Sequence, residues 1–465
     1  MGAESPSESR LGRAWRRGRH ALRTKGWLQP VRHAGTLAVG RGAQAALGLV
    51  ALALAARTLG AELFGTLVLL DSIARTAGAA IRLKPAPSIL RHGAEALRDG
   101  RTRQVQRLIQ HGVLLDLLST LAACGVTLPV LLHADAVFGL APANAALAPL
   151  YLAVVAAMTV SGAPRAVLRL HGQWRLVAAQ SAVPGIVRVL GVLTLVATGT
   201  TSLAAFAGVW IAAHLVRDGS VLGFAAFSLH RHGLARGLAR PASGMLAPAH
   251  HVWRYLWGAQ INASLRRVRD RGAPMIVGAL LGAEGAGLYQ VAERFGQLVE
   301  RPLTRVLRPT MLPELTHQTA RGATRDRRKT VVRIAGLAGL ASVAACAALA
   351  VFGPPLLRLT VGEAYTGAYA AMVLIGVAYV GEAWLFPLQP LLISVGEVRR
   401  MVLVRALATA VYGAAMVALV PVHGVTAAGA VAIAYPATMA LGFGTIARKR
   451  LLGLLRRVPR GGQAP

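Results

Sequence analysis

The chain has 465 residues, 55% of them hydrophobic and 15% charged, and its mean hydropathy is +0.52. Soluble domains carry about 25% charged residues and disordered chains have low hydrophobicity, so the composition excludes an ordinary soluble enzyme and a largely disordered protein. The 51 basic and 18 acidic residues give a net charge of +33, which suits a nucleic acid or a membrane surface, and the hydrophobicity favours the membrane. The two cysteines, Cys124 and Cys346, lie in apolar runs and predict neither a disulfide framework nor a zinc site.

Twelve segments are long and apolar enough to cross a membrane, since a spanning helix needs ~20 mostly apolar residues. In chain order, the predicted spans are 34–56, 62–82, 108–131, 144–168, 177–198, 203–229, 256–281, 285–308, 331–353, 366–394, 401–420 and 424–447. The tenth span contains Pro387 and Pro390, which predict a kink near its end. The sequence therefore predicts an all-α, polytopic integral membrane protein.

Basic residues alternate between the loops. The tails and the even-numbered loops carry most of them, whereas the odd-numbered loops contain only Arg57 and Arg358. This positive-inside pattern predicts an even number of spans and cytoplasmic termini. It also explains most of the net charge through topology and anionic lipid contact, so no nucleic-acid partner is expected. Residues 1–33 lack the pattern of a cleavable signal peptide, and the first span is expected to direct insertion.

An internal repeat divides the chain. Residues 59–65 (LGAELFG) recur 222 residues later as 281–287 (LGAEGAG), and the same offset pairs Asp71 with Glu293 near the middle of their spans. Internal repeats of this kind build two-lobed transporters, so we predict two six-helix lobes in the same orientation around a central cavity. The predicted boundaries are 1–33 for a basic tail, 34–229 and 256–447 for the lobes, 230–255 for a cytoplasmic linker, and 448–465 for a second basic tail.

Charged residues at membrane depth are costly and usually face a cavity or a partner. The basic candidates for substrate binding are Arg75, Arg188, Arg217, Arg266, Arg269 and Arg294. The acidic candidates, for pairing with these arginines or for carrying a coupling proton or Na⁺, are Asp71, Asp270, Glu293 and Glu300. Arginines outnumber acids, and a guanidinium group can bind a phosphate through two hydrogen bonds. The predicted cavity therefore favours an anionic substrate.

Some of these residues have an equally good structural interpretation. Arg217 beside Asp218 and Arg269 beside Asp270 could form local ion pairs, and His214 is predicted to be a packed side chain without a functional role. No catalytic constellation and no P-loop are found, and the predicted loops leave no room for a soluble catalytic domain. The protein is therefore predicted not to be an enzyme.

Several segments resemble the polysaccharide flippases of the multidrug/oligosaccharidyl-lipid/polysaccharide exporter superfamily. They are residues 56–65 (ARTLGAELFG), 89–95 (ILRHGAE), 164–169 (PRAVLR) and 270–278 (DRGAPMIVG). The resemblance covers about residues 35–450 and rests on the order and spacing of these segments. Charged residues are denser in 266–271 than in the usual seventh span of that family.

The resemblance implies translocation of an undecaprenyl-diphosphate-linked oligosaccharide from the inner to the outer leaflet by alternating access. The product would be a surface polysaccharide such as O-antigen, capsule or exopolysaccharide. By position, the family's intramembrane acids correspond to Asp71, Asp270 and Glu293. The expected partners are membrane lipids, a polysaccharide polymerase and glycosyltransferases; a monomer is expected, with no cofactor beyond a coupling proton or Na⁺.

Two alternatives stay open. A drug/cation antiporter of the same superfamily would bind mainly cations, which a net-positive cavity disfavours. A non-transporting membrane component of a polysaccharide synthase would need no substrate path at all. The sugar composition of a substrate has no code in the sequence.

Overall fold

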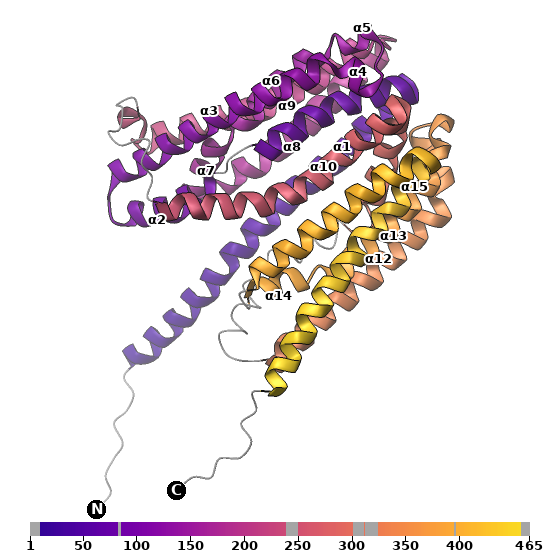
Figure 1. Cartoon of the computed structure of the whole chain (residues 1–465). Coiled ribbons are helices and arrows are strands. Elements are labelled where there is room, and N and C mark those ends of the chain that lie inside the picture. Colours follow the sequence, from indigo (N-terminus) through magenta and orange to yellow (C-terminus); the bar gives the residue numbers. More distant parts are fainter. Residues whose placement is uncertain are drawn as a thin grey trace, which may run out of the picture.

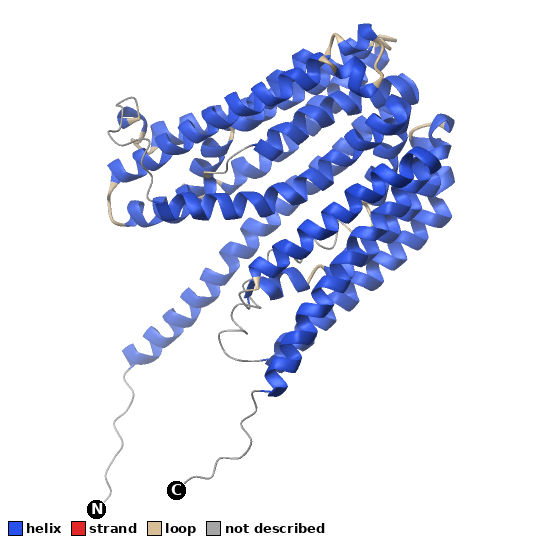
Figure 2. Ribbon diagram, in the orientation of Figure 1, coloured by secondary structure: helices blue, strands red, loops and turns tan. Residues whose placement is uncertain are grey.

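A computed structural model of the chain describes residues 10–81, 85–238, 250–300, 311, 324–394 and 397–456, with the backbone alone described for parts of the helices, including 250–271. Every regular element within these ranges is a helix (Figure 2). In chain order the elements are α1 (Arg10–Ile81), α2 (Ala86–Arg98), α3 (Thr102–Leu132), α4 (Ala134–Phe138), α5 (Pro142–Ala145), the 3-10 helix η1 (Ala148–Tyr151), α6 (Leu152–Val160), α7 (Gly162–Leu170), α8 (Trp174–Ala197), α9 (Leu203–Arg231), η2 (Ala235–Gly237), α10 (His250–Gly296), α12 (Thr324–Thr360), η3 (Glu363–Ala368), α13 (Tyr369–Leu385), α14 (Leu388–Ser394) and α15 (Val398–Arg456).

Three of the helices turn back on themselves at a glycine. Gly60 in α1 (φ 74°, ψ 177°), Gly282 in α10 (φ 75°, ψ −171°) and Gly424 in α15 (φ 67°, ψ −154°) have non-helical backbone angles. This region of backbone space is essentially restricted to glycine. A straight helix of the 72 residues of α1 would measure ~108 Å, far beyond the ~30 Å hydrocarbon core of a bilayer. Each of these helices therefore supplies two arms (Figure 1).

Eight helices among the described residues are long and apolar enough to cross a membrane, which confirms the predicted all-α polytopic class. Eleven of the twelve predicted spans fall wholly or mainly on helices, whereas the eighth, 285–308, is helical as far as Gly296 and residues 301–308 lie outside the described part of the chain. Helix α9 is not among the eight because His214, Arg217 and Asp218 lower its hydropathy. The kink predicted near Pro387 is confirmed, since α13 ends at Leu385 and α14 begins at Leu388. Helix α2 lies in a segment predicted as a loop.

The helices form a bundle whose two sides meet at one end. Helices α3, α6 and α9 lie on one side and α12, α13 and α15 on the other, with α1 and α10 between them (Figure 1). The sides diverge toward the end where α1 begins and α15 ends, which we call the terminal end. The opposite end, which carries the turns at Gly60, Gly282 and Gly424, is called the hairpin end.

Glycines with positive φ repeat the sequence offset in the backbone. Gly60 and Gly282 are 222 residues apart, Gly139 and Gly362 are 223 apart, and Gly199 and Gly424 are 225 apart. All six lie at the hairpin end, in the turns predicted as odd-numbered loops. These spacings agree with a repeat of six spans, while the predicted boundaries of the tails, lobes and linker stay predictions. Residues 239–249 of the linker lie outside the described part of the chain.

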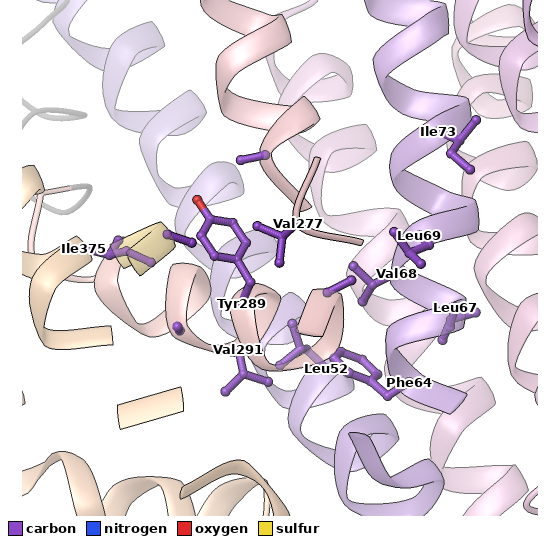
Figure 3. Close-up of a cluster of buried hydrophobic side chains, with 14 of the residues drawn as sticks. Leu52, Phe64, Leu67, Val68, Leu69, Ile73, Val277, Tyr289, Val291 and Ile375 are labelled. Carbon is purple, nitrogen blue, oxygen red and sulfur yellow. The ribbon is translucent and has the colours of Figure 1, made fainter. Parts of the chain in front are cut away.

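A continuous apolar core joins the two repeats near the hairpin end. Figure 3 shows Leu52, Phe64 and Leu69 of α1 close to Val277 and Tyr289 of α10. Small residues allow the helices to approach closely: a Cβ built on Gly278 would lie 2.1 Å from Leu69 Cδ2. Contacts between α1 and α10 therefore hold both halves in one packed body.

Candidate functional site

A buried ionic network lies in the first half of the chain, centred on Asp71. Asp71 and Arg75 are four residues apart in the second arm of α1 and so share a helix face, with Arg75 Nη1 2.8 Å from Asp71 Oδ2. Two other helices reach the second carboxylate oxygen, Oδ1. His214 Nε2 of α9 lies 2.8 Å from it and Arg188 Nη2 of α8 lies 3.9 Å from it. A buried carboxylate needs such partners because an isolated charge is very costly away from water.

Trp210, another residue of α9, also positions Arg188. Its guanidinium carbon lies 4.9 Å from the centre of the Trp210 ring, in cation–π geometry. Its Nη2 atom is also 2.9 Å from His214 Nε2. That imidazole nitrogen can donate to Asp71 or accept from Arg188, but it cannot do both at once. Since His214 Nδ1 is buried without a hydrogen-bond partner among the described residues, we assign the proton to Nε2 and the bond to Asp71.

A second carboxylate, Asp218, lies one turn further along α9 and is completely buried. Arg165 Nη2 of α7 lies 3.0 Å from Asp218 Oδ1. Arg217 Nε donates to the other oxygen at 3.1 Å, and Arg217 Nη2 also contacts it. The predicted local pair between Arg217 and Asp218 is therefore present, with a third member from another helix.

The local structure of α7 places Arg165. Helix α7 starts after a break at Ser161, and the backbone N–H of Ala163 in its first turn donates to Asp116 Oδ2 of α3 at 2.6 Å. A carboxylate at this position is favourable because the first N–H groups of a helix have no partner within the helix. The Asp116 carboxylate thus orients α7.

The two networks lie one turn apart along α9, and together we call them the arginine cluster. Its members are Asp71, Arg75, Arg165, Arg188, His214, Arg217 and Asp218. The side chains of Arg165, Arg75 and Arg217 are 28%, 22% and 21% exposed, whereas those of the two carboxylates are 0% and 7% exposed. An anion that approaches the cluster therefore meets guanidinium groups first, with the carboxylates behind them.

The equivalent place in the second half is acidic and aromatic. A small cavity, which we call the glutamate pocket, is lined by Tyr289, Glu293, Ile375, Ala378, Tyr379, Glu382, Tyr412 and Ala432. Gln297 Nε2 donates to Glu293 Oε1 at 2.9 Å, and the hydroxyls of Tyr289 and Tyr412 are 3.3 Å apart. Carboxylates surrounded by phenol rings suit a small cation or a proton.

The repeat offset relates the two places residue by residue. Asp71 corresponds to Glu293, and Arg75 corresponds to Gln297. In each half the acid bonds with the residue four positions later on the same arm, at 2.8 Å in the first half and 2.9 Å in the second. The exchange of Arg75 for glutamine removes one positive charge at this position of the second half.

The remaining predicted site residues lie on or beside α10. Arg266, Arg269 and Asp270 lie on this helix, but their side chains fall outside the described part of the structure. Arg294 is in the last turn of α10 and Glu300 follows it, and both make polar or charged contacts of their own. Among the described side chains, no three His, Cys, Asp or Glu residues come together as a metal site.

Sequence reasoning missed several members of these sites. His214 is packed as predicted, but it also bonds with Asp71. Arg165 and Trp210 were not predicted as site residues, and neither were the tyrosines of the glutamate pocket. A signal for α9 was available, because His214 and Asp218 are four residues apart at membrane depth and must share one face.

Comparison with solved structures identifies the fold. The chain has the fold of the MATE transporters of the MOP superfamily. It matches an inward-facing multidrug resistance MATE family transporter with a TM-score of 0.66 and 13% identity, over 91% of this chain and 96% of that one. An outward-facing form of a MATE family transporter matches with a TM-score of 0.57 and 14% identity, over 92% and 97% of the two chains.

Sequence comparison finds two further similarities. A family model described as polysaccharide biosynthesis protein matches residues 164–370. The chain is 26% identical to the inner membrane protein YghQ of Escherichia coli (strain K12) over 331 residues, which are 70% of this chain and 90% of that protein. Together with the MATE fold, these matches confirm the predicted resemblance to the polysaccharide exporters of the superfamily.

Proposed function

We propose that this protein translocates a polyprenyl-diphosphate-linked oligosaccharide from the inner to the outer leaflet of the bacterial cytoplasmic membrane. The arginine cluster binds the diphosphate and the sugars enter the predicted central cavity, while the polyprenyl chain stays in lipid. Alternating access moves the head group across. The MATE fold and the match to polysaccharide biosynthesis proteins support this proposal.

The charge of the arginine cluster is the observation that carries the proposal. Four guanidinium groups face two carboxylates, which leaves two positive charges when His214 is neutral. A diphosphate diester carries two negative charges and many acceptor oxygens, and planar guanidinium groups match such oxygens in pairs. Bound substrate would therefore compete with Asp71 and Asp218, the carboxylates that pair with these arginines in the empty site.

Coupling is assigned to the glutamate pocket. Glu293 and Glu382 lie in a small cavity between helices that belong to the second half, and a proton or Na⁺ there would change the charge of that half. Asp71 is the corresponding acid of the first half. Asp270 and Glu300 stay candidates from the sequence for the same role.

We further place both termini in the cytoplasm and the protein in the bacterial inner membrane, as the alternation of basic loops indicates. A polysaccharide polymerase and glycosyltransferases are its proposed partners in the synthesis of O-antigen, capsule or exopolysaccharide, and the working unit is proposed to be a monomer. Membrane lipids surround it.

A second candidate function, drug/cation antiport, is favoured by the glutamate pocket alone. Two carboxylates and three phenols would suit an organic cation. Efflux of ethidium from cells that express the protein, abolished by Glu293→Gln, would support this alternative. Unchanged ethidium retention alongside restored polysaccharide export would exclude it.

Complementation of a strain that lacks its polysaccharide flippase tests the main proposal. We expect the wild-type chain to restore surface polysaccharide and the double variant Arg75→Gln/Arg188→Gln to restore little, because each lost charged hydrogen bond weakens binding by about tenfold or more. The corresponding lysine variants should keep partial export, since an ammonium group still binds phosphate as a point charge.

Protein abundance separates binding from folding in this experiment. Arg101→Gln is the matched control, because Arg101 pairs with Asp99 at an exposed position away from the cluster. Full export by the double glutamine variant at normal abundance would exclude the diphosphate site. The double glutamine variant could instead lose abundance because it leaves Asp71 without its partners. If adding Asp71→Asn then restores both abundance and export, these arginines have a purely structural role.

A further inference from the structure

The two halves of the protein cap each other's helix ends at the hairpin end. One contact uses Tyr365 of η3, whose side chain is completely buried. Its hydroxyl lies 3.2 Å from the carbonyl oxygen of Ala56 and 3.0 Å from that of Gly60, more than 300 residues away in sequence. The ring also packs edge-on against Phe64, with ring centres 6.2 Å apart.

The position of these carbonyl groups explains why they need a partner. Gly60 interrupts the helical backbone of α1, so the last carbonyl groups of the first arm have no regular donor from the following turn. Away from water, an unsatisfied carbonyl is costly. The hydroxyl of Tyr365 supplies the missing donor from the second half of the chain.

A reciprocal contact runs in the other direction. Arg57 Nη1 donates to the carbonyl oxygen of Leu359 at 3.1 Å, and Leu359 lies in the last turn of α12. The first half thus caps a helix of the second half. Arg57 is one of two arginines that break the alternation of basic loops, and this contact gives it a reason to be at the hairpin end.

Between these caps the second arms of α1 and α10 touch through the backbones of their first turns. A Cβ on Gly65 would lie 1.7 Å from Ala283 O, and a Cβ on Gly287 would lie 2.5 Å from Ala61 O. The repeat offset of 222 residues converts one contact into the other, since Gly65 corresponds to Gly287 and Ala61 corresponds to Ala283. The contact therefore has approximate two-fold symmetry, and neither glycine can carry a side chain while it is made.

We propose that these contacts form a releasable clasp that holds the hairpin end closed. The clasp consists of Arg57, Gly65, Gly287 and Tyr365 with the carbonyl groups that they contact. Its hydrogen bonds end on backbone carbonyls, which water can satisfy when the halves separate. The clasp goes beyond the proposed function because it sets which end is open whether or not any substrate is bound.

Distance measurement between the halves tests the clasp without transport. Spin labels at Ala141→Cys, directly before α5, and Thr366→Cys, beside Tyr365 in η3, are both exposed. They would report the separation of the two halves in lipid nanodiscs after Cys124 and Cys346 are replaced by alanine. We expect one short distance for the parent chain. Tyr365→Phe should increase the population with the longer distance about two- to tenfold, the effect of one lost hydrogen bond, and Arg57→Gln should act in the same direction.

Matched variants separate the clasp from general packing. Gly65→Ala should give mainly the longer distance, whereas Gly208→Ala in α9, where an added Cβ meets nothing within 4 Å, should give the parent distribution. Tyr369→Phe is the control for Tyr365→Phe, because the Tyr369 hydroxyl donates to the carbonyl of Ala350 at 2.7 Å within the second half.

The outcomes are distinct. Parent-like distances in Tyr365→Phe and Arg57→Gln would overturn the clasp, as would an equal shift in Tyr369→Phe. If Gly65→Ala fails to fold, the other two variants still decide. If the wild-type chain does not restore polysaccharide export but the variants still shift the distance, the clasp is supported and the proposed function is contradicted. The two failures can therefore be told apart.

Discussion

Asp71 receives contacts from three helices, which makes it the residue on which the first half depends most. Arg75 approaches from its own arm, Arg188 from α8 and His214 from α9. The carboxylate is 7% exposed and Arg188 is 15% exposed, so removal of the negative charge leaves guanidinium groups together with little water. An arginine needs a counter-charge in such surroundings.

We therefore predict that Asp71→Asn lowers stability. Removal of one partner from a buried ion pair costs about 3–5 kcal/mol, and partial exposure of Arg75 reduces the expected loss to about 2 kcal/mol. The measurement is thermal unfolding of the purified protein in nanodiscs. Asp99→Asn is the control, because the exposed pair of Asp99 with Arg101 should contribute less than about 1 kcal/mol. Equal melting temperatures for Asp71→Asn and the parent would show that Asp71 does not hold the cluster together.

The hairpin helices α1, α10 and α15 depend on one backbone conformation each. At Gly60 and Gly282 an added Cβ would meet nothing within 4 Å. A substitution there therefore tests backbone conformation alone, unlike a substitution at Gly65, where atoms collide.

Gly60→Ala should destabilise the protein by about 1–3 kcal/mol, because an L-residue rarely adopts φ near +74° with ψ near 177°. Gly282→Ala should behave in the same way, since the two turns have nearly the same angles. Thermal unfolding compares both with Gly208→Ala, which lies in a regular helix and should not lower stability. A melting temperature unchanged by Gly60→Ala would contradict this account of the turn.

Helices α7 and α9 end in the same way and meet at their ends. Each is followed by a histidine and then a glycine with positive φ, His171–Gly172 and His232–Gly233. The two imidazole rings are stacked, with centres 4.0 Å apart and an angle of 5° between their planes. His171 Nδ1 also lies 2.8 Å from Ser228 Oγ. Burial, and secondarily the nearby His232, lowers the pKa of His171 to about 4.

This lowered pKa predicts how stability changes with pH. Below pH ~6.5 His171 becomes protonated in the unfolded chain, whereas in the folded protein it stays neutral down to about pH 4. The free energy of unfolding should therefore fall as the pH is lowered from 7 to 5. His171→Gln removes this titrating group. The melting temperature of the variant should therefore depend less steeply on pH between 7 and 5 than that of the parent, and the two curves should be parallel above pH 7. Identical slopes between pH 7 and 5 would contradict the assignment.

Considered as a whole, the molecule places the first turn of α1 and the last turn of α15 at the terminal end (Figure 1). The six glycine turns at the hairpin end coincide with the loops that carry few arginines. If the positive-inside rule applies, the terminal end faces the cytoplasm and the hairpin end faces outward.

Reporter fusions after Ser202 and after Leu238 test this orientation. Ser202 precedes α9 at the hairpin end, and Leu238 follows α9 at the other end. A periplasm-active reporter should be active after Ser202 and inactive after Leu238, and a cytoplasm-active reporter should give the opposite result. The same activity at both positions would contradict the membrane topology.

The helical class, the kink near Pro387 and the repeat could be read from the sequence. Hydropathy, proline and the positive-inside pattern act on one segment at a time, because each spanning segment must satisfy its own backbone in lipid. The pairing of Asp71 with Arg75 is also local, since four residues of helix bring them together. The twelve spans and the basic candidates in α1, α8 and α9 follow from the same local rules.

The contacts between helices could not be read in this way. Arg165 meets Asp218 across 53 residues, His214 meets Asp71 across 143, and Tyr365 meets Gly60 across 305. A periodic pattern tells which face of a helix is polar, but not which neighbouring helix lies against that face. Only the packing of α1 against α8, α9 and α10 decides which charges become partners, and that packing depends on the shape of every side chain in the shared core.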